Sequence, residues 1–196
     1  MTEHDFKDDL HRYLRISREA VLWKLDGLPE YDVRRPLVPT GSTLLGVVKH
    51  LAGGEFGYLG ATFGRPSPDE PPYDGSDPNS DMFAFAGESR EFITGLYRKA
   101  WAHSDATIEA LPLDATGHVP WWPAARAEVT LHHVLVRMTD ETARHAGQMD
   151  IMRELIDGAA GHSAGNSSLG PDDQASRHAH CERVERAARE ASRLSG

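Results

Sequence analysis

The sequence predicts an all-α protein, a four-helix bundle with a long crossover between its second and third helices. Four segments carry apolar residues at steps of three and four, and none shows the convincing apolar–polar alternation that is typical of a strand. A proline-rich stretch separates the second and third of these segments. Since an up-and-down bundle needs only short loops, the long connection favours a bundle with a crossover.

The first helix is expected over residues 6–25, where apolar side chains form one stripe before a glycine and a proline end the pattern. The stretch 31–41 contains two prolines and is expected to be a loop. Ser42 or Thr43 can then act as the N-cap of a second helix that runs to about residue 60.

The second helix carries His50 on a face of small residues. The other members of this face are Thr43, Gly46, Gly53 and Gly57. Because none of them has a large side chain, the sequence predicts room around the imidazole and makes this face a candidate pocket wall. Glu55, on the same helix, is expected to be solvated rather than to support the site.

Five prolines fall between residues 64 and 78, and so many breakers exclude regular structure there. This stretch is the expected crossover. A third helix is predicted over 89–110, ended by Pro112. The segment 113–125 has strand-like or irregular character, and its two tryptophans are expected to lie over the bundle as core or lid.

The fourth helix is predicted from about residue 128 to 156, ending where Gly158 can adopt a left-handed cap. Its inward stripe follows steps of three and four through Val134, Met138, Glu141, His145, Gln148, Met152 and Leu155. Three polar residues interrupt this otherwise apolar stripe. A buried carboxylate is costly unless it is paired, so the interruption calls for a partner.

The predicted domain organisation is a bundle over 1–158, a flexible linker over 159–176 that is rich in small and polar residues, and a charged segment over 177–196 that can form a docked helix. Exposed apolar surface on a bundle is typical of proteins that form homodimers, although no residue pattern identifies an interface.

Composition excludes several classes of partner. The formal net charge is -9, which disfavours nucleic acid and anionic membranes, and no apolar run approaches the length of a membrane span. The N-terminus lacks the features of a secretory signal, so the sequence predicts a cytoplasmic protein that binds small molecules. Its single cysteine, Cys181, lies in a polar segment and cannot form an internal disulfide.

His50, Glu141 and His145 form a candidate metal site. Glu141 and His145 are four residues apart on one helix and therefore point the same way, and a packed second helix can bring His50 to them. Two imidazoles and one carboxylate suit a divalent ion, zinc first, with iron or nickel also acceptable. Three protein ligands leave a coordination position open, which is the catalytic arrangement.

The same residues also permit a structural interpretation. Glu141 and His145 can form an ordinary intrahelical pair, while His50 can be a satisfied helix histidine. Gln148, one turn beyond His145, is a candidate contact to a bound water or substrate, or a buried hydrogen-bonding residue.

Two stretches resemble the DinB-like metal-binding four-helix bundle family. They are LLGVVKHLAGGEFGYLG around His50 and TLHHVLVRMTDETARHAGQMDIMRELIDG around His145. The resemblance covers residues 1 to about 158 and is closest to the actinobacterial branch that includes the N-terminal domain of mycothiol-dependent maleylpyruvate isomerase. It implies a divalent metal, commonly zinc or nickel, on His50, Glu141 and His145.

The resemblance also implies a reaction class. Characterised relatives are thiol-dependent isomerases and S-transferases, so mycothiol is the implied low-molecular-weight thiol and a small-molecule electrophile the implied partner. Gln148 stands where a further histidine often follows the HAG triplet, which argues against a fourth protein ligand. The tail after Gly158 is too short and polar to supply the additional domain of the larger isomerases, so isomerase activity is not expected.

The function predicted from the sequence is therefore that of a metal-dependent mycothiol S-transferase, in which a divalent metal activates the thiolate. Two alternatives remain at this point: a non-catalytic bundle that binds a metal or another ligand, and a metal-dependent hydrolase.

Overall fold

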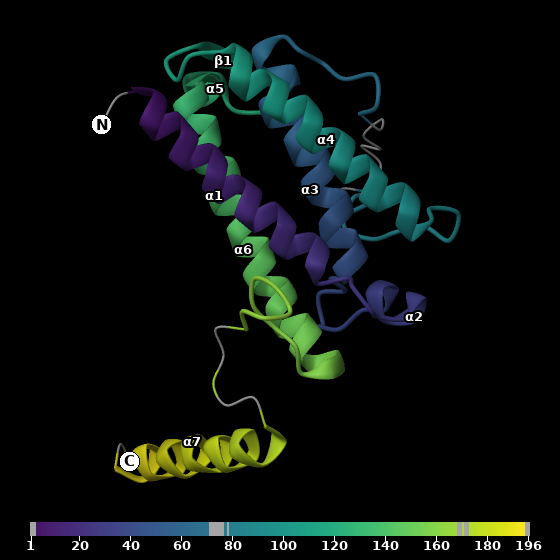
Figure 1. Cartoon of the computed structure of the whole chain (residues 1–196), viewed down its shortest axis with the longest axis vertical. Helices are drawn as coiled ribbons and strands as arrows, with labels where there is room; N and C mark the ends of the chain where they lie inside the picture. The colour runs from purple at the N-terminus through teal and green to yellow at the C-terminus, as the bar shows by residue number, and fades with distance from the viewer. Residues whose placement is uncertain (1–2, 71–76, 78, 168–169, 171–172, 195–196) are drawn as a thin grey trace.

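Four long helices form a bundle in the computed structural model, which describes residues 3–70, 77, 79–167, 170 and 173–194. They are α1 (Glu3–Trp23), α3 (Leu44–Leu59), α4 (Arg90–Ala110) and α6 (Leu131–Asp157). α1 packs along α6, and α3 packs against both α4 and α6 (Figure 1). The expected crossover falls in the long connection between α3 and α4, of which residues 71–76 and 78 lie outside the described part of the chain. The all-α bundle predicted from the sequence is confirmed.

Side-chain caps set the ends of these helices. The Thr43 hydroxyl accepts a hydrogen bond from the Gly46 amide at the start of α3, and the Ser89 hydroxyl accepts one from the Phe92 amide at the start of α4. Each satisfies an amide that has no partner within its helix. Gly158 ends α6 with φ of 76°, the left-handed conformation that glycine adopts most readily.

The apolar stripes of the helices meet in two clusters of buried residues. One joins α1, α3, α4 and the second half of α6, and the other joins α1, the end of α3 and the first half of α6. Fully buried members include Val21, Leu51, Phe56, Ile93, Tyr97, Val134 and Met138. Leu155 is an exception to the predicted inward stripe: its exposed fraction is 63%.

Glu55 is buried in this core, and the expectation that it is solvated is wrong. Its exposed fraction is 0%, and both of its carboxylate oxygens accept hydrogen bonds from Arg18 of α1, each at 2.6 Å. Arg18 also donates to Asp105 of α4 at 2.7 Å. The ion pair therefore links three helices, and its burial is explained by a partner that lies 37 residues away in the sequence.

Short elements fill the connections. They are α2 (Glu30–Arg34), the 3-10 helix η1 (Ala61–Phe63), β1 (Thr116–His118), α5 (Ala124–Ala127) and β2 (Glu128–Thr130). α2 forms inside the stretch expected to be a loop, because burial of Val33 anchors it. The expected start of the fourth helix near residue 128 is also wrong, since β2 pairs antiparallel with β1 there and Thr130 caps α6.

α7 (Gln174–Leu194) follows the bundle and has no buried residue (Figure 1). Part of the stretch expected to be a linker contacts the bundle, because the Gly161 amide donates to Asp150 at 2.6 Å and the Lys24 ammonium donates to the Gly161 carbonyl. None of the described helices combines the length and the apolar composition that a membrane span requires.

Candidate metal centre

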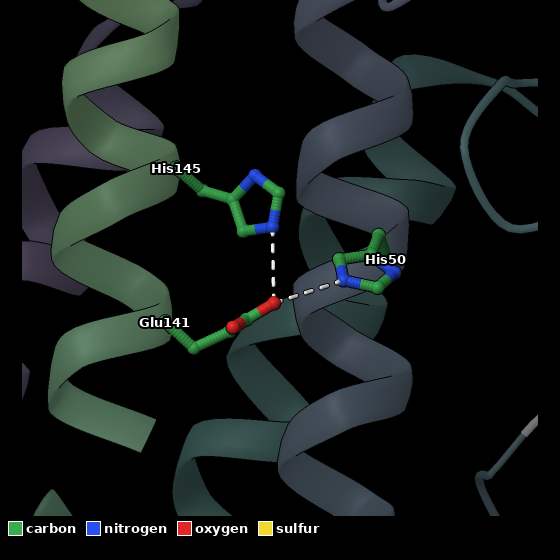
Figure 2. Close-up of side chains that lie close together, drawn as sticks. All are labelled: His50, Glu141 and His145. Atoms are coloured by element: carbon green, nitrogen blue, oxygen red, sulfur yellow. Dashed lines mark hydrogen bonds and ion pairs between the residues drawn. The ribbon is translucent and has the colours of Figure 1, made fainter. Parts of the chain in front are cut away.

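His50 of α3 meets Glu141 and His145 of α6 in the interior between the two helices. One ligand atom of each residue lies within 4.8 Å of those of the other two, as the sequence pattern predicts (Figure 2). Their burial is graded: the exposed side-chain fraction is 8% for His145, 26% for Glu141 and 30% for His50. The cluster is thus held by the core on one side and open to solvent on the other.

The two distances from Glu141 to the histidines are close to those between ligands of one small ion. Glu141 Oε1 lies 3.2 Å from His145 Nε2 and 3.5 Å from His50 Nε2. Zinc binds nitrogen and oxygen at about 2.0–2.1 Å, so tetrahedral geometry places two ligand atoms about 3.3 Å apart. The two distances to Glu141 are close to this value, and the ligand atoms of all three residues lie within 4.8 Å of one another, so the three side chains are near enough to share a divalent ion.

The other nitrogen of each ring is already bonded. His50 Nδ1 lies 2.7 Å from Asp81 Oδ2, and His145 Nδ1 lies 3.0 Å from Gln148 Oε1. Both acceptors require an N–H, so each Nδ1 donates. Each Nε2 then carries either a lone pair, which can bind a metal ion, or a second proton, which can be donated to Glu141. This pattern of bonded Nδ1 and inward Nε2 is typical of metal-binding histidines.

His50 and His145 change the pKa of the Glu141 carboxyl. Burial alone would raise the pKa of Glu141, but the charge on His145 and hydrogen bonds to His50 and His145 outweigh burial and hold that pKa below its ordinary value. Glu141 is therefore ionised at neutral pH. An ionised carboxylate beside two imidazoles is a donor set suited to zinc, iron or nickel.

Asp81 and Ser42 complete the arrangement, and the sequence pattern assigns neither to the site. Gln148 donates from Nε2 to the Ser42 hydroxyl at 3.2 Å while accepting from His145. Gln148 thus has the hydrogen-bonding role that the sequence allowed as one of its two interpretations. Ser42 is recognisable only as a candidate cap, and Asp81 lies in the crossover, where no periodicity marks it.

The loop that carries Asp81 contacts α3 at two positions that precede His50. Lys49 donates to the carbonyls of Ser80 and Phe83 at 3.1 and 3.3 Å and pairs with Glu88 at 2.9 Å. One turn earlier, the Met82 carbonyl lies only 1.8 Å from the position that a Cβ on Gly46 would occupy. Gly46 is therefore filled by backbone and makes no room at the imidazole.

The other two glycines of this face differ from each other in how much space surrounds them. A Cβ on Gly57 would lie 2.9 Å from the ring of Trp121, whereas a Cβ on Gly53 would have no neighbour within 4 Å. The predicted room along α3 is consequently limited to the turn that follows His50.

Comparison with known families decides the classification. The family model described as mycothiol-S-transferase matches residues 9–158. The chain belongs to the mycothiol S-transferase family. This family is DinB-like, as the sequence motifs indicate. Among curated proteins, the search finds no match to the chain. The family match ends at the α6 cap and includes all three residues of the cluster.

Proposed function

We propose that this protein is a metal-dependent mycothiol S-transferase that joins the thiol to a small-molecule electrophile. Membership of the family supports the transferase reaction and the thiol. The observation that carries metal dependence is the convergence of His50, Glu141 and His145, with ligand atoms within 4.8 Å of one another.

In this proposal the two Nε2 atoms and Glu141 hold the metal, and zinc is the preferred ion. A divalent ion bound there would lower the pKa of a thiol at the open coordination position and so supply a thiolate at neutral pH. Asp81 and Gln148 keep the two rings oriented by accepting hydrogen bonds from Nδ1. The exposed edges of Glu141 and His50 give both substrates access from solvent.

The thiol has to come from a cosubstrate. The only cysteine of the chain, Cys181, is exposed on α7 and lies outside the segment that matches the family. The transferred sulfur would therefore belong to mycothiol. Its S–H bond breaks with loss of the proton to solvent, and a new bond forms between sulfur and the electrophilic carbon as the leaving group departs or the double bond takes up a proton.

Calorimetric titration tests thiol activation. Mycothiol is expected to bind the zinc-loaded protein at least about tenfold more tightly than the metal-free protein, because a thiolate bound to the metal adds an interaction that the apo site lacks. Proton release, measured by repeating the titration in buffers of different ionisation enthalpy, should accompany binding only in the loaded protein. Equal affinity and equal proton release in both forms would contradict the proposal.

Asp81→Asn is expected to weaken zinc affinity by about 10–100-fold, because the amide accepts more weakly than the carboxylate and no longer fixes the His50 ring as firmly. Competition with a chromogenic chelator measures this change. Asp69→Asn is the matched control: Asp69 lies in the same connection but pairs with Lys99 at the surface, so zinc affinity should not change. Unchanged affinity in Asp81→Asn would remove Asp81 from the supporting residues.

A further inference from the structure

Arg137 of α6 has a guanidinium group whose hydrogen-bond donors are only partly satisfied among the described residues. Its Cζ lies 4.8 Å from the ring centre of Tyr58 and 5.3 Å from that of Trp122, so the guanidinium contacts the faces of two aromatic rings. Its Nε is buried and has no hydrogen-bond partner among the residues that the structure describes. The guanidinium is a planar fork of donors that is charged at every physiological pH.

Among the residues that the structure describes, no carboxylate forms an ion pair with this cation. Glu141, one turn further along α6, is engaged by His50 and His145 instead. The Tyr58 hydroxyl accepts hydrogen bonds from the indole N–H groups of Trp121 and Trp122, at 3.3 and 3.1 Å, which links the two rings over Arg137 to the ring of Trp121. Aromatic faces attract a cation but do not accept hydrogen bonds from all of its N–H groups. An anion with two acceptor oxygens would complete the set.

Arg137 also lies close to the metal centre, on the same pair of helices. α3 and α6 run antiparallel: His50 contacts Glu141, and Tyr58, later in α3, contacts Arg137, earlier in α6. The two sites are four residues apart on α6 and eight apart on α3, which correspond to about 6 and 12 Å along the helix axes. The turn of α3 between them includes Gly53, where no atom lies within 4 Å of a Cβ position.

We propose that Arg137, Tyr58 and Trp122 form a binding site for a carboxylate of the electrophilic substrate, roughly 6–12 Å from the reacting atom. The Arg137 fork binds the carboxylate in a bidentate manner, and the exposed ring of Trp121, whose exposed fraction is 51%, offers a face to the planar group that carries it. The assignment to the electrophile rests on the proposed transferase function. The carboxylate site itself does not, since the binding test needs no catalysis.

Benzoate and its neutral analogue benzamide are the probes. In the zinc-loaded full chain, benzoate is expected to bind roughly ten- to a hundredfold more tightly than benzamide, as a bidentate charged contact adds to ring stacking. In ¹⁵N spectra the indole signals of Trp121 and Trp122 should shift on benzoate addition, whereas that of Trp23 should not. Arg137→Gln should abolish both the preference and the shifts.

Two variants separate binding at Arg137 from binding at a surface arginine or on the metal ion. Arg144→Gln removes an exposed arginine of the same helix and should retain the preference for benzoate. His145→Ala removes a candidate metal ligand and should also retain it, because benzoate is expected at Arg137 and not on the ion. If Arg137→Gln does not fold, Arg137→Lys keeps a cation over the rings but loses the bidentate fork, and benzoate affinity should fall about tenfold.

The proposal is overturned if benzoate binds no better than benzamide, if the preference survives in Arg137→Gln or is undiminished in Arg137→Lys, or if it is lost in His145→Ala. Tighter binding of inorganic phosphate than of benzoate would also overturn it, since the site would then take a phosphoryl group. Benzoate preference in a protein that fails to bind mycothiol would keep the carboxylate site and refute the transferase function, so the two failures are distinguishable.

Discussion

His145→Ala is expected to abolish stoichiometric metal in the purified protein. Zinc sites with four protein ligands bind with apparent free energies of about 10–16 kcal/mol, so one ligand is worth roughly 3 kcal/mol, or about two orders of magnitude in affinity. His145 is also the least exposed member of the cluster, with 8% of its side chain accessible, so solvent cannot easily replace it. Elemental analysis after dialysis measures the outcome, and His50→Ala should behave likewise.

His133→Ala provides the matched control for this prediction. His133 lies on the same helix but is exposed, and its ring contacts Trp122, away from the cluster. Its replacement should leave the metal content unchanged. Full metal occupancy and a native circular dichroism spectrum in His145→Ala would exclude that residue from the ligand set, and the same result for single alanine variants of all three cluster residues would reject the site.

Local sequence patterns predict the helices and the residues of the site that lie on them. The step of four between Glu141 and His145 fixes their common direction, and Thr43, Ser89 and Gly158 mark helix ends through hydroxyl caps and a left-handed glycine. These features act within one or two turns. The approach of His50 to the pair follows from helix packing, which the bundle pattern anticipates.

Local sequence patterns do not predict contacts between segments that are distant in the chain. Asp81 lies in an irregular connection, and its bond to His50 depends on the Lys49 contacts and on the absence of a side chain at Gly46. Glu55 resembles a surface residue in its local pattern because its partner, Arg18, belongs to another helix. Hydrophobic periodicity predicts which face of a helix a residue occupies, but it does not predict which residue of opposite charge lies next to it. Two expectations stay predictions: that the protein forms a homodimer, and that α7 docks against the bundle.

Glu55→Gln is expected to lower the free energy of unfolding by about 3 kcal/mol or more, because it leaves Arg18 buried with only Asp105 as an ionic partner. Burial would lower the pKa of Arg18, but the charges of Glu55 and Asp105 outweigh burial and raise it, so Arg18 stays charged in the core. For a domain of this size the melting temperature should fall by on the order of 10 °C. Urea titration and thermal scans measure both quantities.

A double variant distinguishes loss of a partner from loss of packing. In Arg18→Met with Glu55→Leu, both charges are gone and apolar side chains of similar reach fill the space, so much of the stability lost in Glu55→Gln should return. Glu185→Gln, in the exposed pair with Arg189 on α7, should change the free energy of unfolding little, because solvent screens that pair. If the single Glu55 variant were as stable as the parent protein, the Arg18–Glu55 pair could not be what joins α1 to α3, and apolar packing alone would have to hold α1 against the helix that carries His50.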